Sequence, residues 1–248
     1  MRYLLSLLRA WVIINPLIVL STALFGTWSI ILSFFDRGGR RQHRTARAWG
    51  RSLLLVGGVR VRVEGAENLA PGQNYVLAAN HLSYMDIPAL LPHIPVEFRF
   101  MAKRSLWKTP FLGHHLEKAG HLPVDFDSPK NSLKTMREAA LTVAQRKTSV
   151  LVFPEGGRSP GALRPFKEGV AYIAIRAGVP VVPIGIVGTR EVVPMGSFHV
   201  RPGKVCIRIG SPIPTAGLVM HDRGAFTGQL FERVSCLMEQ AWRDQAAM

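Results

Sequence analysis

Hydrophobic and polar positions change their pattern several times along the chain. Residues 11–35 carry no charged side chain, and this run is longer than the ~20 apolar residues that cross a bilayer. Residues 59–65 then alternate apolar and polar side chains, which predicts a strand with one solvent-facing side. Residues 226–242 follow a helical period and predict a terminal amphipathic helix. The pattern therefore predicts a membrane-anchoring helical segment over residues 1–51 and one folded domain over residues 52–248.

The other segments of this domain alternate between expected strands and expected helices. Short apolar runs predict further strands at residues 75–79, 97–102, 121–124, 149–153, 179–187 and 204–209. Apolar stripes predict helices that begin near Ile87, Leu106, Ser128 and Lys167. Pro180 and Pro183 indicate irregular or edge pairing for the strand that contains them. Strands that alternate with helices indicate an α/β fold with a mixed, largely parallel sheet flanked by helices.

Arginines flank the apolar run, mainly on its C-terminal side. They are Arg2, Arg9, Arg37, Arg40, Arg41, Arg44, Arg47 and Arg51. Their excess after the run predicts that this flank stays at the cytoplasmic face of the inner or plasma membrane, against anionic headgroups. A secretory signal does not fit, because its apolar region is only ~7–15 residues long. Pro16 and Gly26 interrupt the run, so a spanning helix and a hairpin that dips into one leaflet both remain open.

The net charge of +15 narrows the class of partner. A surface of this kind suits lipid headgroups, phosphorylated metabolites or nucleic acid. Nucleic-acid binding rests on the charge alone, because the sequence lacks a recognisable binding module. Cys206 and Cys236 provide neither a disulfide framework nor metal-ligand spacing. The net charge alone does not choose among these partners, but much of it clusters beside the apolar N-terminal run, which favours a membrane surface. The two cysteines give no sign of a bound metal.

Asn80, His81 and Asp86 form the first candidate for chemistry, directly after the predicted strand at 75–79. A histidine can act as a general base near neutral pH, and a carboxylate on its other ring nitrogen orients the ring and stabilises the imidazolium. The five-residue spacing brings the two side chains together if His81 lies on a loop and Asp86 in the first turn of a helix. A chance pair of this spacing is the alternative.

The second candidate is the segment 153–159, which follows another predicted strand. Arg158 presents a planar fork that suits a phosphate, and Glu155 could accept from a substrate hydroxyl or hold Arg158 in place. Lys103 follows a strand and could add a phosphate contact; a solvated surface charge is the alternative. The sequence has neither a Gly-x-Ser-x-Gly elbow nor a cysteine in a nucleophile's context. These residues therefore favour direct attack by a substrate hydroxyl on an acyl donor.

In order and spacing, these residues resemble the 1-acyl-sn-glycerol-3-phosphate acyltransferases and related glycerolipid acyltransferases. The resemblance runs from about Val59 to Ile209. Its matching positions are Asn80-His81 through Asp86, Phe153 through Ser159, Val181 through Ile184, and Lys103, Pro110 and Gly113 between the first two blocks.

The resemblance implies transfer of an acyl group from acyl-CoA or acyl carrier protein to the free hydroxyl of a lyso-lipid, by default 1-acyl-sn-glycerol-3-phosphate. It implies that His81 deprotonates that hydroxyl and that Asp86 orients His81. The acceptor would be bound by Glu155, Gly156, Arg158 and Lys103. Neither a cofactor nor a metal is expected.

Two departures from the family pattern leave the acceptor open. Phe126 stands where the family has an arginine thought to contact the acceptor phosphate, and Gly157 stands where it has threonine. Loss of one charge-assisted hydrogen bond costs ~1.5–3 kcal/mol unless a neighbouring cation compensates. Another lyso-lipid, either lyso-ornithine-type or a lysophospholipid with a larger head, therefore remains an alternative acceptor. A non-catalytic basic membrane-surface protein is the alternative to an enzyme.

Overall fold

A mixed sheet forms the centre of the computed structural model, which describes residues 2–36, 38–110, 112–125 and 129–248. Its strands in the described chain are β1 (Val59–Glu64), β2 (Val76–Ala79), β3 (Phe98–Lys103), β4 (Leu122–Val124), β5 (Ser149–Val152), β6 (Val181–Val187) and β7 (Gly203–Ile209). They lie in the order β1-β7-β6-β2-β5-β3-β4, and only the β6–β7 pair is antiparallel. The predicted α/β class with a largely parallel sheet is confirmed.

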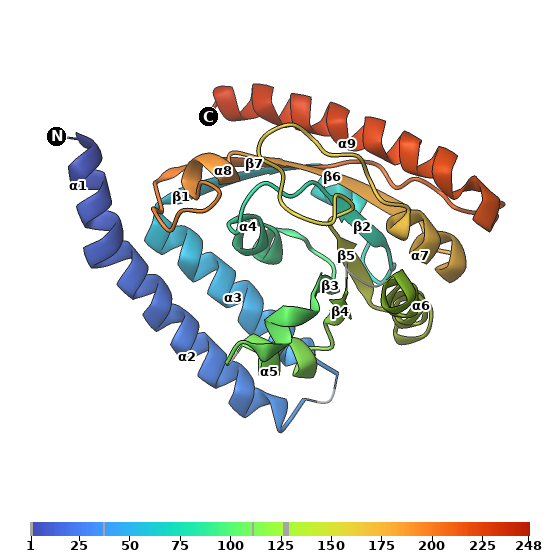
Figure 1. Cartoon of the computed structure of the whole chain (residues 1–248), viewed down its shortest axis with the longest axis horizontal. Helices are drawn as coiled ribbons and strands as arrows, with labels where there is room; N and C mark the ends of the chain where they lie inside the picture. Colours follow the sequence, from blue (N-terminus) through green and yellow to red (C-terminus); the bar gives the residue numbers. More distant parts are fainter. Residues whose placement is uncertain (1, 37, 111, 126–128) are drawn as a thin grey trace.

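Helices cover both faces of this sheet (Figure 1). After the N-terminal helices they are α4 (Asp86–His93), α5 (Leu112–Lys118), α6 (Pro129–Arg146), α7 (Gly169–Ala177), α8 (Thr189–Val192) and α9 (Arg223–Ala246). The buried hydrophobic residues form two clusters, one on each face of the sheet, and alternate residues of β2 belong to different clusters. Leu77 and Ala79 pack toward α3 (Arg40–Gly57) and α4, whereas Val76 and Ala78 pack toward α6, α7 and α9. Both faces of the central strands are therefore buried, as expected for parallel strands between helical layers.

The apolar run forms one continuous helix. Helix α1 (Arg2–Arg9) passes through a π-helical turn (Ala10–Ile14) into α2 (Asn15–Ser33), and Pro16 lies in the first turn of α2. The π turn shifts the hydrogen-bond register just before the residue that has no N–H to donate. The chain then turns back into α3 (Arg40–Gly57). The helical hairpin is therefore made by α2 and the arginine-rich α3, and Pro16 and Gly26 do not break the apolar run.

Leu4–Ser33 is long and apolar enough to cross a membrane, and only 11% of its most apolar 18-residue stretch is buried in the protein. Its buried edge is held by a row of polar contacts, called here the polar seam. The seam consists of Ser6 with His199, Ser21 with Ser52, Ser29 with His115, Ser33 with His114, and the Trp49 indole N–H donating to Thr22. The apolar helix is thus attached to the domain along most of its length.

Three expectations differ from the structure: the extent of one helix, the position of the domain boundary, and the place of one strand in the sheet. The expected helix at 106–119 is a short 3-10 helix (Arg104–Lys108) followed by α5, because Pro110 lies between them. The expected boundary between residues 51 and 52 falls inside α3, which is continuous across it.

The third difference concerns β6, which is a central strand and not an edge strand. The Pro183 carbonyl faces β7 and accepts from the Gly210 N–H at 2.8 Å, while the β6–β7 ladder itself begins at Ile184. The missing N–H of Pro183 therefore falls just outside the ladder that would need it. This placement lets proline occupy the middle of the sheet.

Candidate active site

Three neighbouring parallel strands deliver the predicted site residues to one edge of the sheet. β2 leads into Asn80-His81, β5 leads into Phe153, and β3 ends at Lys103. β5 lies between β2 and β3, and all three run in the same direction. Their carboxyl ends therefore open on the same side, where binding sites gather in open α/β sheets.

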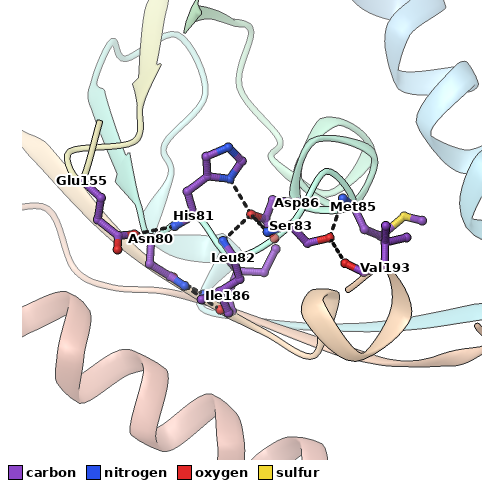
Figure 2. Close-up of polar contacts among 9 residues, drawn as sticks. All are labelled: Asn80, His81, Leu82, Ser83, Met85, Asp86, Glu155, Ile186 and Val193. Carbon is purple, nitrogen blue, oxygen red and sulfur yellow. Dashed lines mark hydrogen bonds and ion pairs between the residues drawn. The ribbon is translucent and has the colours of Figure 1, made fainter. Parts of the chain in front are cut away.

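His81 and Asp86 form a direct pair (Figure 2). The distance between His81 Nδ1 and Asp86 Oδ2 is 2.6 Å, and the same oxygen accepts the backbone N–H groups of Leu82 at 2.7 Å and Ser83 at 2.9 Å. Asp86 is the first residue of α4 and is fully buried. The expected combination of a loop histidine with an aspartate in a helix's first turn is the one observed. The two backbone bonds wrap the loop around the carboxylate.

The face of the His81 ring packs against the ring of Phe153. The two rings stack with centroids 4.0 Å apart and an interplanar angle of 16°. Because Asp86 accepts only, Nδ1 carries the proton and Nε2 is left with its lone pair directed away from the carboxylate. The His81 side chain is 17% exposed, so this nitrogen lies at the margin of the protein. The arrangement suits a general base.

Two polar residues of the first motif, Asn80 and Ser83, fix the loop to the sheet, and the sequence analysis gave their side chains no role of their own. The Asn80 side chain accepts from the Ile186 N–H at 2.7 Å and donates to the Ile186 carbonyl at 2.9 Å. The Ser83 hydroxyl donates to the Val193 carbonyl at 2.8 Å. Both partners follow or belong to β6, so their proximity depends on the sheet order. The sequence signal that could have identified Asn80 is a short polar side chain directly after a buried strand.

Glu155 connects the two motifs through backbone bonds. Its Oε1 accepts from the His81 N–H at 2.7 Å and its Oε2 accepts from the Arg164 N–H at 2.9 Å. Only 4% of the residue is exposed. Burial raises the pKa of the Glu155 carboxyl, and the hydrogen bonds from Arg164 and His81 oppose that rise. Contact of Glu155 with the acceptor remains a prediction, whereas its contacts in the protein make it a clamp between the motifs.

A backbone bond brings the second motif next to the first: the Ser159 N–H donates to the His81 carbonyl at 2.8 Å. Gly156 shapes the turn with a φ of +74°, and a Cβ there would lie 3.0 Å from the Lys167 ammonium. A side chain at Gly156 is therefore strained and crowded. A Cβ at Gly157 would meet nothing closer than an Arg164 guanidinium nitrogen at 3.9 Å.

Arg158 is not held by Glu155. Its guanidinium carbon lies 3.7 Å from the centroid of the Tyr84 ring, in a cation–π arrangement. Tyr84 belongs to the first motif and was not predicted as a site residue. Lys103 is exposed at the end of β3, and Phe126 lies outside the residues that the structure describes. The structure thus places His81, Asp86, Glu155, Gly156 and Arg158 together, with Lys103 at the same edge of the sheet.

The histidines after Lys103 serve packing. His114 and His115 belong to the polar seam, and His121 Nδ1 accepts from the Phe100 N–H at 2.9 Å. Burial lowers the pKa of His115 to about 4 and holds that of His121 well below its usual value, with Arg99 adding to both shifts. Within the described ranges, no group of three or more His, Cys, Asp or Glu side chains could hold a metal ion.

Comparisons with known proteins agree with this arrangement. The sequence pattern of the family described as Acyltransferase matches residues 60–187. A Saccharomyces cerevisiae protein named 1-acyl-sn-glycerol-3-phosphate acyltransferase is 31% identical over 227 residues, which cover 89% of this chain and 75% of the yeast protein. A Cocos nucifera protein of the same name is 32% identical over 167 residues, which cover 67% of this chain and 54% of the coconut protein.

A solved structure extends the likeness to the whole fold. The 1-acyl-sn-glycerophosphate acyltransferase of Thermotoga maritima is similar to this chain with a TM-score of 0.80 at 27% sequence identity. The comparison covers 97% of both chains. The likeness to the solved protein therefore includes the N-terminal helices as well as the domain matched by the family pattern.

Proposed function

Because this chain belongs to the acyltransferase family, we propose that it transfers a fatty acyl group from an acyl thioester to the free hydroxyl of 1-acyl-sn-glycerol-3-phosphate. The product is phosphatidate, and the donor is acyl-CoA or acyl carrier protein. The names of the curated relatives support this acceptor. The observation that carries the proposal is the contact between His81 Nδ1 and the buried Asp86 carboxylate at 2.6 Å.

His81 begins the reaction as a general base. Its Nε2 takes the proton from the acceptor hydroxyl while that oxygen attacks the thioester carbonyl. Asp86 holds Nδ1–H and stabilises the imidazolium that forms. The tetrahedral intermediate then collapses, the carbon–sulfur bond breaks, and the imidazolium returns its proton to the departing thiolate. One ester bond replaces one thioester bond, and His81 ends as neutral imidazole.

The acceptor phosphate binds beside this base. Arg158 supplies a planar set of N–H donors, and Lys103 adds positive charge from the next strand. Gly156 lets the turn of the second motif approach closely. Glu155 holds the backbones of both motifs, so the distance from base to phosphate is set by the clamp as well as by the sheet.

Replacement of His81 tests the base. We expect His81→Ala to lower turnover by ~10²–10⁴-fold with unchanged thermal unfolding, because the variant loses proton transfer but keeps the fold. Arg158→Ala should mainly raise the KM for a phosphorylated acceptor. The assay supplies labelled acyl-CoA or acyl carrier protein together with a panel of lyso-lipids. Near-normal turnover by His81→Ala would remove His81 from the mechanism, and preference for a phosphate-free acceptor would replace the proposed substrate.

The protein is associated with the membrane through its apolar N-terminal helix, and we propose that this helix lies within one leaflet at the cytoplasmic face. The polar seam attaches residues 21–33 of the helix to α3 and α5, and it attaches Ser6 near the N-terminal end to His199. A groove of about 370 Å³ between α2 and α3 is lined by aromatic side chains together with Arg41 and Arg44. A crossing orientation would carry these arginines into hydrocarbon, where charged side chains are costly.

Cysteine labelling distinguishes the two orientations. In a Cys236→Ser background, Leu4→Cys and Phe34→Cys place one thiol near each end of the helix, while Cys206 is buried. An impermeant maleimide should label both new thiols in vesicles with the cytoplasmic face outward, and neither in vesicles of the opposite orientation. Labelling of the two thiols from opposite sides would establish a spanning helix.

A further inference from the structure

Tyr84 links the two motifs through the Arg158 side chain. The ring belongs to the first motif and is 58% exposed, and the half-buried guanidinium belongs to the second motif. The guanidinium carbon lies 3.7 Å from the ring centroid. This contact joins two segments that are more than seventy residues apart in the sequence. It therefore depends on the order of the strands.

The stack holds Arg158 without using its hydrogen-bond donors. A cation–π contact is made to the face of the guanidinium, whereas its N–H groups lie in the plane and point outward from the edge. In the part of the chain that the structure describes, no hydrogen bond or ion pair uses those donors. A carboxylate partner would occupy the donors and neutralise the charge. Glu155, the acidic residue of the same turn, is already bound to two backbone N–H groups.

The support for the Tyr84 ring is the loop that positions the base. Asp86 accepts the N–H groups of Leu82 and Ser83, and the Met85 N–H donates to the Ser83 hydroxyl at 3.2 Å. Tyr84 lies between these anchored residues. These bonds fix the backbone on both sides of Tyr84, so the point from which the ring extends is held relative to His81.

We propose that Tyr84 is a positioning residue that presents the free N–H edge of Arg158 to the acceptor phosphate at a set distance from His81. This inference rests on the proposed function, because the anion is the phosphate of the lyso-lipid acceptor. The ring supplies a planar support that resists the many rotamers of an arginine side chain. The phosphate is then bound by donors that are already oriented, which improves binding in the ground state.

Two substitutions separate the ring from the hydroxyl. Tyr84→Leu removes the aromatic face at similar bulk, and we expect the KM for 1-acyl-sn-glycerol-3-phosphate to rise about fivefold, as for loss of an exposed cation–π contact. Tyr84→Phe keeps the face, so its KM should stay within about twofold of the unaltered protein. kcat should change little in either variant, because Tyr84 acts on the bound phosphate and not on the proton transfer. Trp242→Leu, an exposed aromatic on α9, is the matched control and should leave KM unchanged.

A double-variant comparison tests whether Tyr84 acts through Arg158. On an Arg158→Met background, Tyr84→Leu should add no further increase in KM, because the group that the ring supports is gone. Additive effects would overturn the proposal. A fall in kcat at constant KM would also overturn it, because it would place the ring's effect on His81. An equal loss with monoacylglycerol as acceptor would assign the ring to the glycerol or the acyl chain instead.

Direct binding keeps the inference separate from the proposed function. Calorimetric titration of the full chain with sn-glycerol 3-phosphate measures the anion site without any turnover. Weaker binding in Tyr84→Leu, by the same factor of about five and restored in Tyr84→Phe, supports the positioning role even if acyl transfer is not found. Unchanged binding in Tyr84→Leu together with weaker binding in Arg158→Met overturns the positioning role and leaves the proposed function intact.

Discussion

Replacement of Glu155 by glutamine tests whether one buried carboxylate keeps the two motifs in register. The carboxylate accepts one backbone N–H from each side, at 2.7 Å from His81 and at 2.9 Å from Arg164. Glutamine has nearly the same shape but only one oxygen. One of the two N–H groups would therefore face an amide nitrogen that also donates.

The expected cost follows from these two bonds. A buried N–H without an acceptor costs ~1–3 kcal/mol. The variant also loses a buried charge, whose own cost is expressed in the raised pKa of the Glu155 carboxyl, and this gain offsets part of the loss. We expect a net loss of ~1–2 kcal/mol in the free energy of unfolding. For a chain of 248 residues this corresponds to a fall in Tm of about 2–8 °C.

The effect on activity should be larger than the effect on stability. Displacement of the His81 backbone relative to the Arg158 turn by even ~1 Å can lower a rate by ~10²-fold. Thermal unfolding and kcat/KM measured on the same samples compare the two effects. Glu168→Gln is the matched control, because this exposed side chain only approaches Arg223 at 3.5 Å and its loss should cost at most ~0.5 kcal/mol. Wild-type Tm and kcat/KM in Glu155→Gln would refute the clamp.

Three further predictions follow from the described side chains. Asp86→Ala leaves two buried backbone N–H groups without their acceptor, so urea unfolding should show a loss of ~2–4 kcal/mol in stability, and most turnover should also be lost. Loss of turnover with unchanged stability would mean that the loop does not need the carboxylate to fold. Burial lowers the pKa of His43 to about 3, so the stability that depends on its neutral form is full above about pH 6.5 and declines as the pH falls. His43 alone should account for ~2–3 kcal/mol of the stability lost by pH 4.5, and the buried His115 and His121 add their own losses. The loss in His43→Leu should be smaller by this amount, and an unchanged pH profile in that variant would contradict the assignment. Gly157→Thr should leave Tm within ~1 °C, because a Cβ at this position meets only an Arg164 guanidinium nitrogen at 3.9 Å. Any change in acceptor preference measured with the lyso-lipid panel would then come from the added side chain. A large fall in Tm would contradict the open space that the structure shows around Gly157.

Local patterns were sufficient for most elements of the fold. The alternating run at β1 and the apolar runs at β2 and β5 were each predicted within one or two residues. Such segments are decided by side-chain period and burial, which are readable along the chain. The sheet order was not readable, because the pairing of β6 with both β2 and β7 is decided by non-local contacts. Irregular or edge pairing was expected for β6, and the edge alternative was wrong for this reason.

The predicted site residues were found at one edge, but their contacts were only partly anticipated. The pairing of His81 with Asp86 follows from five-residue spacing and a helix start, which are local. The partners of Glu155 and Arg158 are not local. Glu155 accepts from the loop after β2, and Arg158 stacks on a ring from the other motif instead of pairing with the glutamate three residues before it.

The sequence by itself determined the chemistry that is present: a base, a carboxylate to orient it, an arginine on a glycine-rich turn, and an apolar helix beside a row of arginines. These features depend on residue type and short spacing, which the chain carries without folding. Only the tertiary structure decided which groups from distant segments touch. The order β6-β2-β5-β3 brings loops from distant parts of the chain together, and burial then favours hydrogen bonds among the polar groups that these loops bring within reach. For this reason Glu155 became a clamp, and Tyr84 became the support of Arg158.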